Sequence, residues 1–125
     1  MEVIKEGNDL YKQINEKGLY KVLEEENFIN GSLVDISTRL TDEEKQQILE
    51  IIREESGSDE IDDFYTIREI LNDLDNRAEE LGMPKCLMPY FDAIAMLKDQ
   101  IISGEIAYTN LVKDGINFLV FYYTQ

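Results

Sequence analysis

The sequence predicts a predominantly helical α+β fold, with about four helices packed in one layer group and a C-terminal β-hairpin. Three observations lead to this class. Apolar residues recur at helical spacing through much of the chain, capping and stop signals separate the segments, and the composition becomes β-branched and aromatic after Gly104. The length of 125 residues fits one domain, so we treat residues 1–125 as a single acidic helical domain. An all-α five-helix bundle is the alternative.

The N-terminal segment gives mixed signals. Residues 8–26 have helical spacing that is interrupted by Gly18. Because glycine inside a helix costs about 1 kcal/mol relative to alanine, we expect two short helices or one bent helix. The pair Asn30-Gly31 is a turn signal and could close a small hairpin.

The middle of the chain predicts two helices. Thr41 and Glu44 have the spacing of a capping box, which indicates a helix start, and residues 56–58 form a Ser-Gly-Ser stop. From Asp59 to Leu81, apolar residues recur every three or four positions. This spacing predicts one long amphipathic helix, on the order of 30 Å in length.

The C-terminal part predicts a helix followed by a hairpin. Pro89 suits the first turn of a helix, where its missing amide hydrogen has no intrahelical partner. Residues 106–108 and 116–123 are rich in β-branched and aromatic types, and Asp114-Gly115 supplies a tight turn between them. A fifth helix from Asn110 is the rival interpretation. Because the strand residues are apolar on both faces, we expect this segment to be buried or covered by a partner.

Charge is the global property that departs furthest from the average. The chain has 27 acidic and 12 basic residues, a net charge of −15. Residues 41–80 alone carry 15 acidic and four basic residues, a net −11, which leaves −4 for the rest. Such a surface repels nucleic acids and anionic lipids and attracts a basic partner. We therefore expect neither direct nucleic-acid binding nor membrane binding.

The residue types that are missing exclude several catalytic mechanisms. The chain has no histidine and a single cysteine, Cys86, so it cannot form a Ser-His-Asp site, a Cys-His site, a tetrahedral zinc site or an internal disulfide. We interpret Cys86 as a small buried residue of an interhelical loop. The N-terminus lacks the features of a secretory signal and no apolar run reaches about 18 residues, so we expect a cytoplasmic protein.

Carboxylate pairs are the remaining candidates for chemistry. At a spacing of three or four residues on a helix, two carboxylates share a face and could hold magnesium. The pairs with this spacing are Glu60 with Asp63, Glu69 with Asp73, and Glu50 with Glu54. A solvated helix face is the plainer interpretation in so acidic a chain. We expect no enzyme, no cofactor and no metal, and keep a Mg-dependent helical hydrolase as the third hypothesis.

In size and charge alone, the chain resembles small acidic inhibitors that cover the nucleic-acid-binding surface of another protein. Immunity, anti-restriction and anti-CRISPR proteins include such inhibitors. No sequence motif accompanies this resemblance. It implies a basic partner, such as a nuclease or another nucleic-acid-binding enzyme, but no residue roles. Our own hypothesis is that the chain occludes this partner through carboxylates of residues 42–63 and 69–80, which would mimic a nucleic acid.

The candidate partner-binding residues are the exposed carboxylates expected on the acidic helices and two aromatic residues near the C-terminus. They are Glu50, Glu54, Glu55, Asp59, Glu60, Asp62, Asp63, Glu69, Asp73, Tyr122 and Tyr123. Because neighbouring strand residues face opposite ways, at least one of the two tyrosines is expected to be free for contact. The alternative function is a non-catalytic regulatory or scaffold subunit that binds through its aromatic C-terminal segment, with a homodimer left open.

Overall fold

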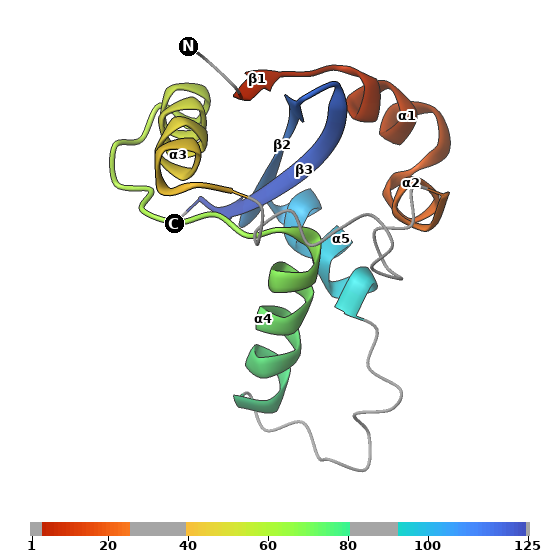
Figure 1. Cartoon of the computed structure of the whole chain (residues 1–125). Coiled ribbons are helices and arrows are strands. Elements are labelled where there is room, and N and C mark those ends of the chain that lie inside the picture. The colour runs from red at the N-terminus through yellow and green to blue at the C-terminus, as the bar shows by residue number, and fades with distance from the viewer. Residues whose placement is uncertain (1–3, 26–39, 81–92, 125) are drawn as a thin grey trace.

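The computed structural model describes residues 4–25, 40–80 and 93–124, without the side chains of residues 78 and 79. The described part contains five helices and three strands (Figure 1), and it confirms the predominantly helical α+β class. In chain order they are β1 (Ile4–Glu6), α1 (Asp9–Lys17), α2 (Leu19–Glu25), α3 (Asp42–Ser56), α4 (Ile67–Glu80), α5 (Ala93–Ser103), β2 (Ile106–Lys113) and β3 (Ile116–Tyr123).

The strands form an antiparallel sheet in the order β1-β2-β3. Strands β2 and β3 make the predicted hairpin, in which Lys113 pairs with Ile116 across a two-residue turn. Asp114 and Gly115 both have positive φ angles, 53° and 80°, as a type I′ turn requires. The hairpin rules out the five-helix bundle. Strand β1, which pairs with the end of β2 near this turn, was not predicted because three residues carry too little pattern.

Helices cover both faces of the sheet rather than forming a single layer group. Figure 1 shows α3 on one side and α1, α2 and α5 on the other. In β3, Phe118, Val120 and Tyr122 pack in the core beneath α3. Leu119 and Phe121 face the opposite core, formed with α1, α2, α4 and α5. The hairpin is therefore apolar on both faces because each face has its own hydrophobic core.

Several helix boundaries agree with the sequence signals. The Thr41 hydroxyl accepts a hydrogen bond from the Glu44 amide at 3.1 Å, and the Glu44 carboxylate accepts one from the Thr41 amide at 3.0 Å. Helix α3 ends at Gly57, whose φ of 72° lies in the left-handed region. Gly18, with φ of 90°, separates α1 from α2, so the prediction of two short helices is confirmed.

The prediction of one long helix from Asp59 to Leu81 is wrong in its first part. Residues 59–66 form no helix, and α4 begins at Ile67. The backbone of Tyr65 instead pairs with Phe121 of β3, through hydrogen bonds of 2.7 and 2.8 Å. An extended chain advances about 3.3 Å per residue, whereas a helix advances about 1.5 Å. The extended segment therefore crosses the sheet edge with fewer residues than a helix would need.

The true start of α4 carries its own capping signal. The Thr66 amide donates to the Glu69 carboxylate at 3.0 Å, and the Glu69 amide donates to the Thr66 hydroxyl at 3.5 Å. This repeats the Thr41–Glu44 pattern. Ile61 has the apolar spacing of α4 but lies before that helix. Its side chain is apolar because it fills the core beneath α3.

Some sequence predictions fall on residues that the structure does not describe. They concern the turn at residues 30–31, the end of the long helix at Leu81, Cys86, and the helix start at Pro89. Among the described helices, none has the length and apolar character needed to cross a membrane.

Candidate functional site

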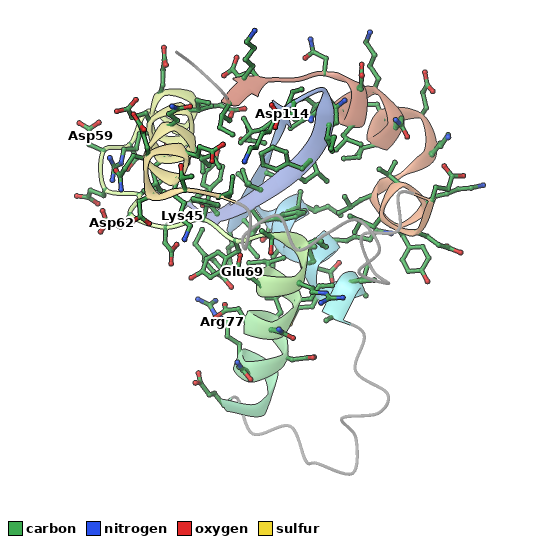
Figure 2. The ribbon with its side chains drawn as sticks, viewed as in Figure 1. Lys45, Asp59, Asp62, Glu69, Arg77 and Asp114 are labelled. Carbon is green, nitrogen blue, oxygen red and sulfur yellow. The ribbon has the colours of Figure 1, made fainter. Side chains whose placement is uncertain are left out.

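Most of the predicted contact residues lie on the surface. Eight carboxylates are exposed: Glu50, Glu54, Glu55, Asp59, Glu60, Asp62, Asp63 and Glu69. Figure 2 shows Asp59 and Asp62 on the connection between α3 and α4, directed away from the sheet. These side chains are therefore available to another molecule.

Six of the eight exposed carboxylates fall into two groups at opposite edges of the sheet. The first group, which we call the β1 group, consists of Glu50, Glu54 and Glu55. Glu50 and Glu54 line a hollow of about 370 Å³ with β1, and Glu54 and Glu55 line one of about 350 Å³ that reaches α1 and β2. Since β1 is an outer strand, this group lies at the β1 edge.

The second group lies at the β3 edge and is called the connection group. It consists of Glu60, Asp62 and Asp63, which line a hollow of about 290 Å³ together with Tyr65 and Tyr123. The hollow is placed at this edge because Tyr65 pairs with β3. The structure thus brings Tyr123 together with three of the predicted carboxylates and leaves the β1 group elsewhere.

A compact polar and aromatic cluster stands beside the connection group. The Tyr65 and Tyr123 rings meet edge to face, with centroids 5.6 Å apart and planes at 82°. The Tyr123 hydroxyl donates a hydrogen bond to the carboxylate of Asp73 on α4. Arg77 Nε lies 3.4 Å from the same carboxylate, and the Arg77 guanidinium carbon lies 4.2 Å from the Tyr123 ring centroid. These contacts hold the Tyr123 ring in place.

Burial and neighbouring carboxylates keep both tyrosines protonated. Desolvation raises the pKa of Tyr123, and its hydrogen bond to Asp73 raises that pKa further. Desolvation also raises the pKa of Tyr65, with smaller contributions from the charges of Asp63 and Asp73. Both rings are therefore neutral at physiological pH and keep the electron-rich face that attracts cations.

In the β1 group, Glu55 is held in place by the sheet. Its carboxylate accepts a hydrogen bond from the Thr109 hydroxyl at 2.6 Å and a weak one from the Tyr11 hydroxyl at 3.5 Å. Thr109 is buried, with 1% of its surface exposed. The Glu55 charge is therefore fixed relative to β2, whereas no such hydrogen bond is seen for Glu50 or Glu54 among the described residues.

The predicted contact residues Glu69, Asp73 and Tyr122 also have structural roles. Glu69 caps α4 through Thr66 while remaining exposed, and Asp73 is half-buried against Tyr123. Tyr122 is only 4% exposed and packs in the core beneath α3. Its assignment as a contact residue is therefore corrected, since the strand alternation turns Tyr122 inward and leaves Tyr123 at the surface.

Few cations offset the negative charge of residues 41–80, which we call the acidic zone. Between described residues of positions 41–80, two ion pairs form: Arg53 with Asp62 at 3.7 Å and Arg77 with Asp73 at 3.4 Å. Asp62 is 90% exposed in its side chain, so its pair contributes little to stability. The carboxylates with no described lysine or arginine within 4 Å include Glu50, Glu54, Glu55, Asp59, Glu60 and Asp63.

The carboxylate pairs proposed for magnesium do not converge on one site. Glu60 and Asp63 are not on a helix, so their three-residue spacing does not place them on a common helical face. In the described part of the chain, no three acidic or cysteine side chains are grouped closely enough to hold a metal ion. The magnesium-dependent hydrolase stays an untested alternative.

The sequence interpretation missed Tyr65 and Arg77, which complete the cluster around Tyr123. Tyr65 was assigned to a helix, and nothing in the local pattern indicated that it would pair with β3. The capping signal at Thr66 and Glu69 was available, and would have left Tyr65 outside the helix.

The fold and surface together define a class: a small α+β domain with helices on both sheet faces and two exposed carboxylate groups. Comparison with protein-family models, curated proteins and solved structures finds no match for this chain. The function is therefore argued from the surface alone.

Proposed function

We propose that this chain is a small acidic inhibitor that binds a basic, nucleic-acid-handling protein and covers its nucleic-acid-binding surface. The observation that carries the proposal is the set of exposed carboxylates on α3 and the α3–α4 connection, most of which have no cation within 4 Å among the described residues. Such a partner presents lysine and arginine side chains arranged for phosphates, which carboxylates can occupy in their place.

The charge distribution supports an intermolecular role. Residues 41–80 carry a net −11, and like charges within about 10 Å repel one another at physiological salt. A surface that serves solubility alone is better built with interspersed lysines. A basic partner relieves this repulsion and is steered toward the surface during encounter. The proposal includes a cytoplasmic location and a role like that of an immunity or anti-CRISPR protein.

The alternative, a scaffold subunit that binds through its aromatic C-terminal segment, receives less support. Phe118, Phe121 and Tyr122 are each at most 4% exposed, and they complete the two cores of the domain. Tyr123 is the aromatic residue of β3 that reaches the surface. Strand β3 therefore offers little aromatic area for a partner.

The first experiment is affinity capture of partners from the lysate of the native host, washed at low and then at high salt. We expect a basic nucleic-acid-binding protein that is released at high salt, because screening weakens contacts between exposed charges. DNA or RNA should compete with the chain for that protein. A neutral partner that resists salt would contradict the proposal and favour a scaffold.

A charge-reversal variant then tests which surface binds. Lysine substitutions at Glu54, Asp59, Asp62 and Asp63 should slow association with the captured partner about tenfold or more, with a smaller effect on dissociation. The matched control carries lysine at Glu16, Glu24, Asp99 and Glu105, which are exposed residues outside the acidic zone. Both variants change the net charge equally, so equal association rates would count against the acidic zone as the binding surface.

A further inference from the structure

We infer that the hollow between the α3–α4 connection and the end of β3 receives an arginine side chain of the basic partner. The inference rests on the proposed function and names the chemical group that one part of the surface recognises. It concerns the hollow of about 290 Å³ whose lining includes Tyr65, Tyr123 and the connection group.

The size of the hollow suits a single side chain. Sites for small molecules and cofactors usually occupy roughly 300 to 1,000 Å³, so this hollow is at the lower end of that range. Tyr65 and Tyr123 line it on the β3 side, and Tyr65 is fixed by its backbone pairing with Phe121. The aromatic lining is thus held by the sheet.

The electrostatics of the hollow select a cation. Glu60, Asp62 and Asp63 line it and are exposed, and of these three residues Asp62 has Arg53 at 3.7 Å while Glu60 and Asp63 have no described lysine or arginine within 4 Å. Asp63 uses one oxygen, Oδ1, to accept the Phe64 amide at 2.9 Å, which orients the carboxylate and leaves the second oxygen for another donor. A cation in this position meets carboxylates and aromatic rings together, and both attract positive charge.

The protein itself contains an example of this recognition. The Arg77 guanidinium lies over the Tyr123 ring while Arg77 Nε approaches Asp73. The same tyrosine also lines the hollow. One guanidinium therefore already lies over Tyr123 beside a carboxylate, and the hollow places tyrosines and carboxylates side by side in the same way, at Tyr65 and the connection group.

Arginine fits this site better than lysine. Its planar guanidinium stacks on aromatic rings and donates two parallel hydrogen bonds to a carboxylate, whereas the ammonium of lysine is a compact, strongly hydrated point charge. The long apolar stem of arginine can also lie along the tyrosine rings. The expected occupant is therefore an arginine side chain, and lysine is the comparison in the test.

The test uses two peptides of equal length and charge, one with arginine and one with lysine at every basic position. Their dissociation constants for the full chain are measured by calorimetry at fixed salt. We expect the arginine peptide to bind about 3- to 5-fold more tightly, the size of a cation–π contact at an exposed site. Glu60→Gln with Asp62→Asn should abolish this preference, and so should Tyr65→Leu.

The matched control is Glu50→Gln with Glu54→Gln in the β1 group, which changes the net charge equally. Both double variants should weaken peptide binding in general, but only the connection-group variant should remove the preference for arginine. Circular dichroism checks that each variant is folded. The Glu60 and Asp62 substitutions change exposed side chains, so the test does not depend on whether Tyr65→Leu folds.

Nuclear magnetic resonance with N-acetyl-arginine amide as the probe examines the hollow directly. We expect the ring resonances of Tyr65 and Tyr123 to shift in the wild type and to stay unchanged in the connection-group variant. If both peptides bind equally and the rings do not respond, the hollow is not an arginine site while the acidic surface remains a binding surface. If the rings respond but affinity capture yields no basic nucleic-acid-binding protein, the proposed function fails and the arginine site stands.

Discussion

Glu44 Oε2 lies 2.8 Å from Lys113 Nζ, and only 9% and 16% of the two side chains are exposed. This ion pair joins the first turn of α3 to the end of β2, beside the hairpin turn. The other oxygen of Glu44 accepts the Thr41 amide in the capping box. One carboxylate thus caps α3 and ties it to the sheet, which orients the helix that carries the β1 group.

Breaking this pair should destabilise the fold. Lys113→Met leaves the Glu44 charge largely buried without its partner, and we expect a loss of about 2 to 3 kcal/mol in the free energy of unfolding. Urea denaturation measures it, and Glu43→Gln, an exposed neighbour in the same turn, is the control. The double variant Glu44→Gln, Lys113→Met should cost less than the sum of the single variants, and strict additivity would show that the pair contributes nothing.

The same pair predicts a pH dependence. The hydrogen bond from Lys113 and, to a smaller extent, the hydrogen bond from the Thr41 amide lower the pKa of Glu44 below its ordinary value of 4.5. Its stabilising contribution is therefore complete above pH of about 4.5 and is lost as pH falls through the lower pKa of the folded state. Urea denaturation of wild type and Glu44→Gln between pH 7 and pH 3 should show a stability difference that shrinks at the acidic end. A constant difference would contradict this linkage.

The tyrosines predict a second transition at high pH. Burial raises the pKa values of five described tyrosines above 10.0, and they are Tyr11, Tyr65, Tyr108, Tyr122 and Tyr123. A raised pKa stabilises the fold fully below the unfolded value of about 10, and this contribution is lost as pH rises toward the folded value. Absorbance at 295 nm should show less ionisation near pH 10.5 in the native protein than in 8 M urea. Identical titration curves would show that these hydroxyls are not buried.

Gly7 sits where the chain passes from β1 to α1 against the hairpin. A Cβ atom there would lie 2.6 Å from Val112 Cγ2 and 2.9 Å from Asn117 Oδ1, closer than such contacts allow. Gly7→Ala should therefore reduce the free energy of unfolding by about 1 to 3 kcal/mol. Thermal denaturation measures the loss, with Glu6→Ala as the exposed neighbouring control. Equal melting temperatures for the two variants would show that the hairpin yields to the extra methyl group.

Local signals predicted much of the secondary structure. The Thr41–Glu44 box, the break at Gly18 and the Asp114-Gly115 turn each act through a few neighbouring residues, and each has its expected effect in the structure. The segment around Tyr65 could not be predicted in this way. Its conformation depends on backbone pairing with Phe121, which is 56 positions away in the sequence.

The candidate site was likewise predictable in part: some of its features follow from the sequence and others depend on contacts between distant segments. The exposure of the acidic residues was predictable, because charged side chains are rarely buried without a partner. Their separation into a β1 group and a connection group was not, since it depends on which sheet edge each segment reaches. The choice between Tyr122 and Tyr123 was also open, because alternation separates the two rings without saying which face is covered more completely at the end of β3.

The sequence by itself determined the class, the acidic character of the surface, the helix ends at Gly18, Thr41 and Gly57, and the hairpin turn, because these follow from composition and from contacts between near neighbours. Only the tertiary structure decided that helices cover both faces of the sheet, that residues 59–66 are not helical, and that Tyr65, Tyr123 and Arg77 meet beside the connection group. The physical reason is that these arrangements come from burying apolar faces and pairing backbone groups between segments distant in the chain, which no local pattern encodes.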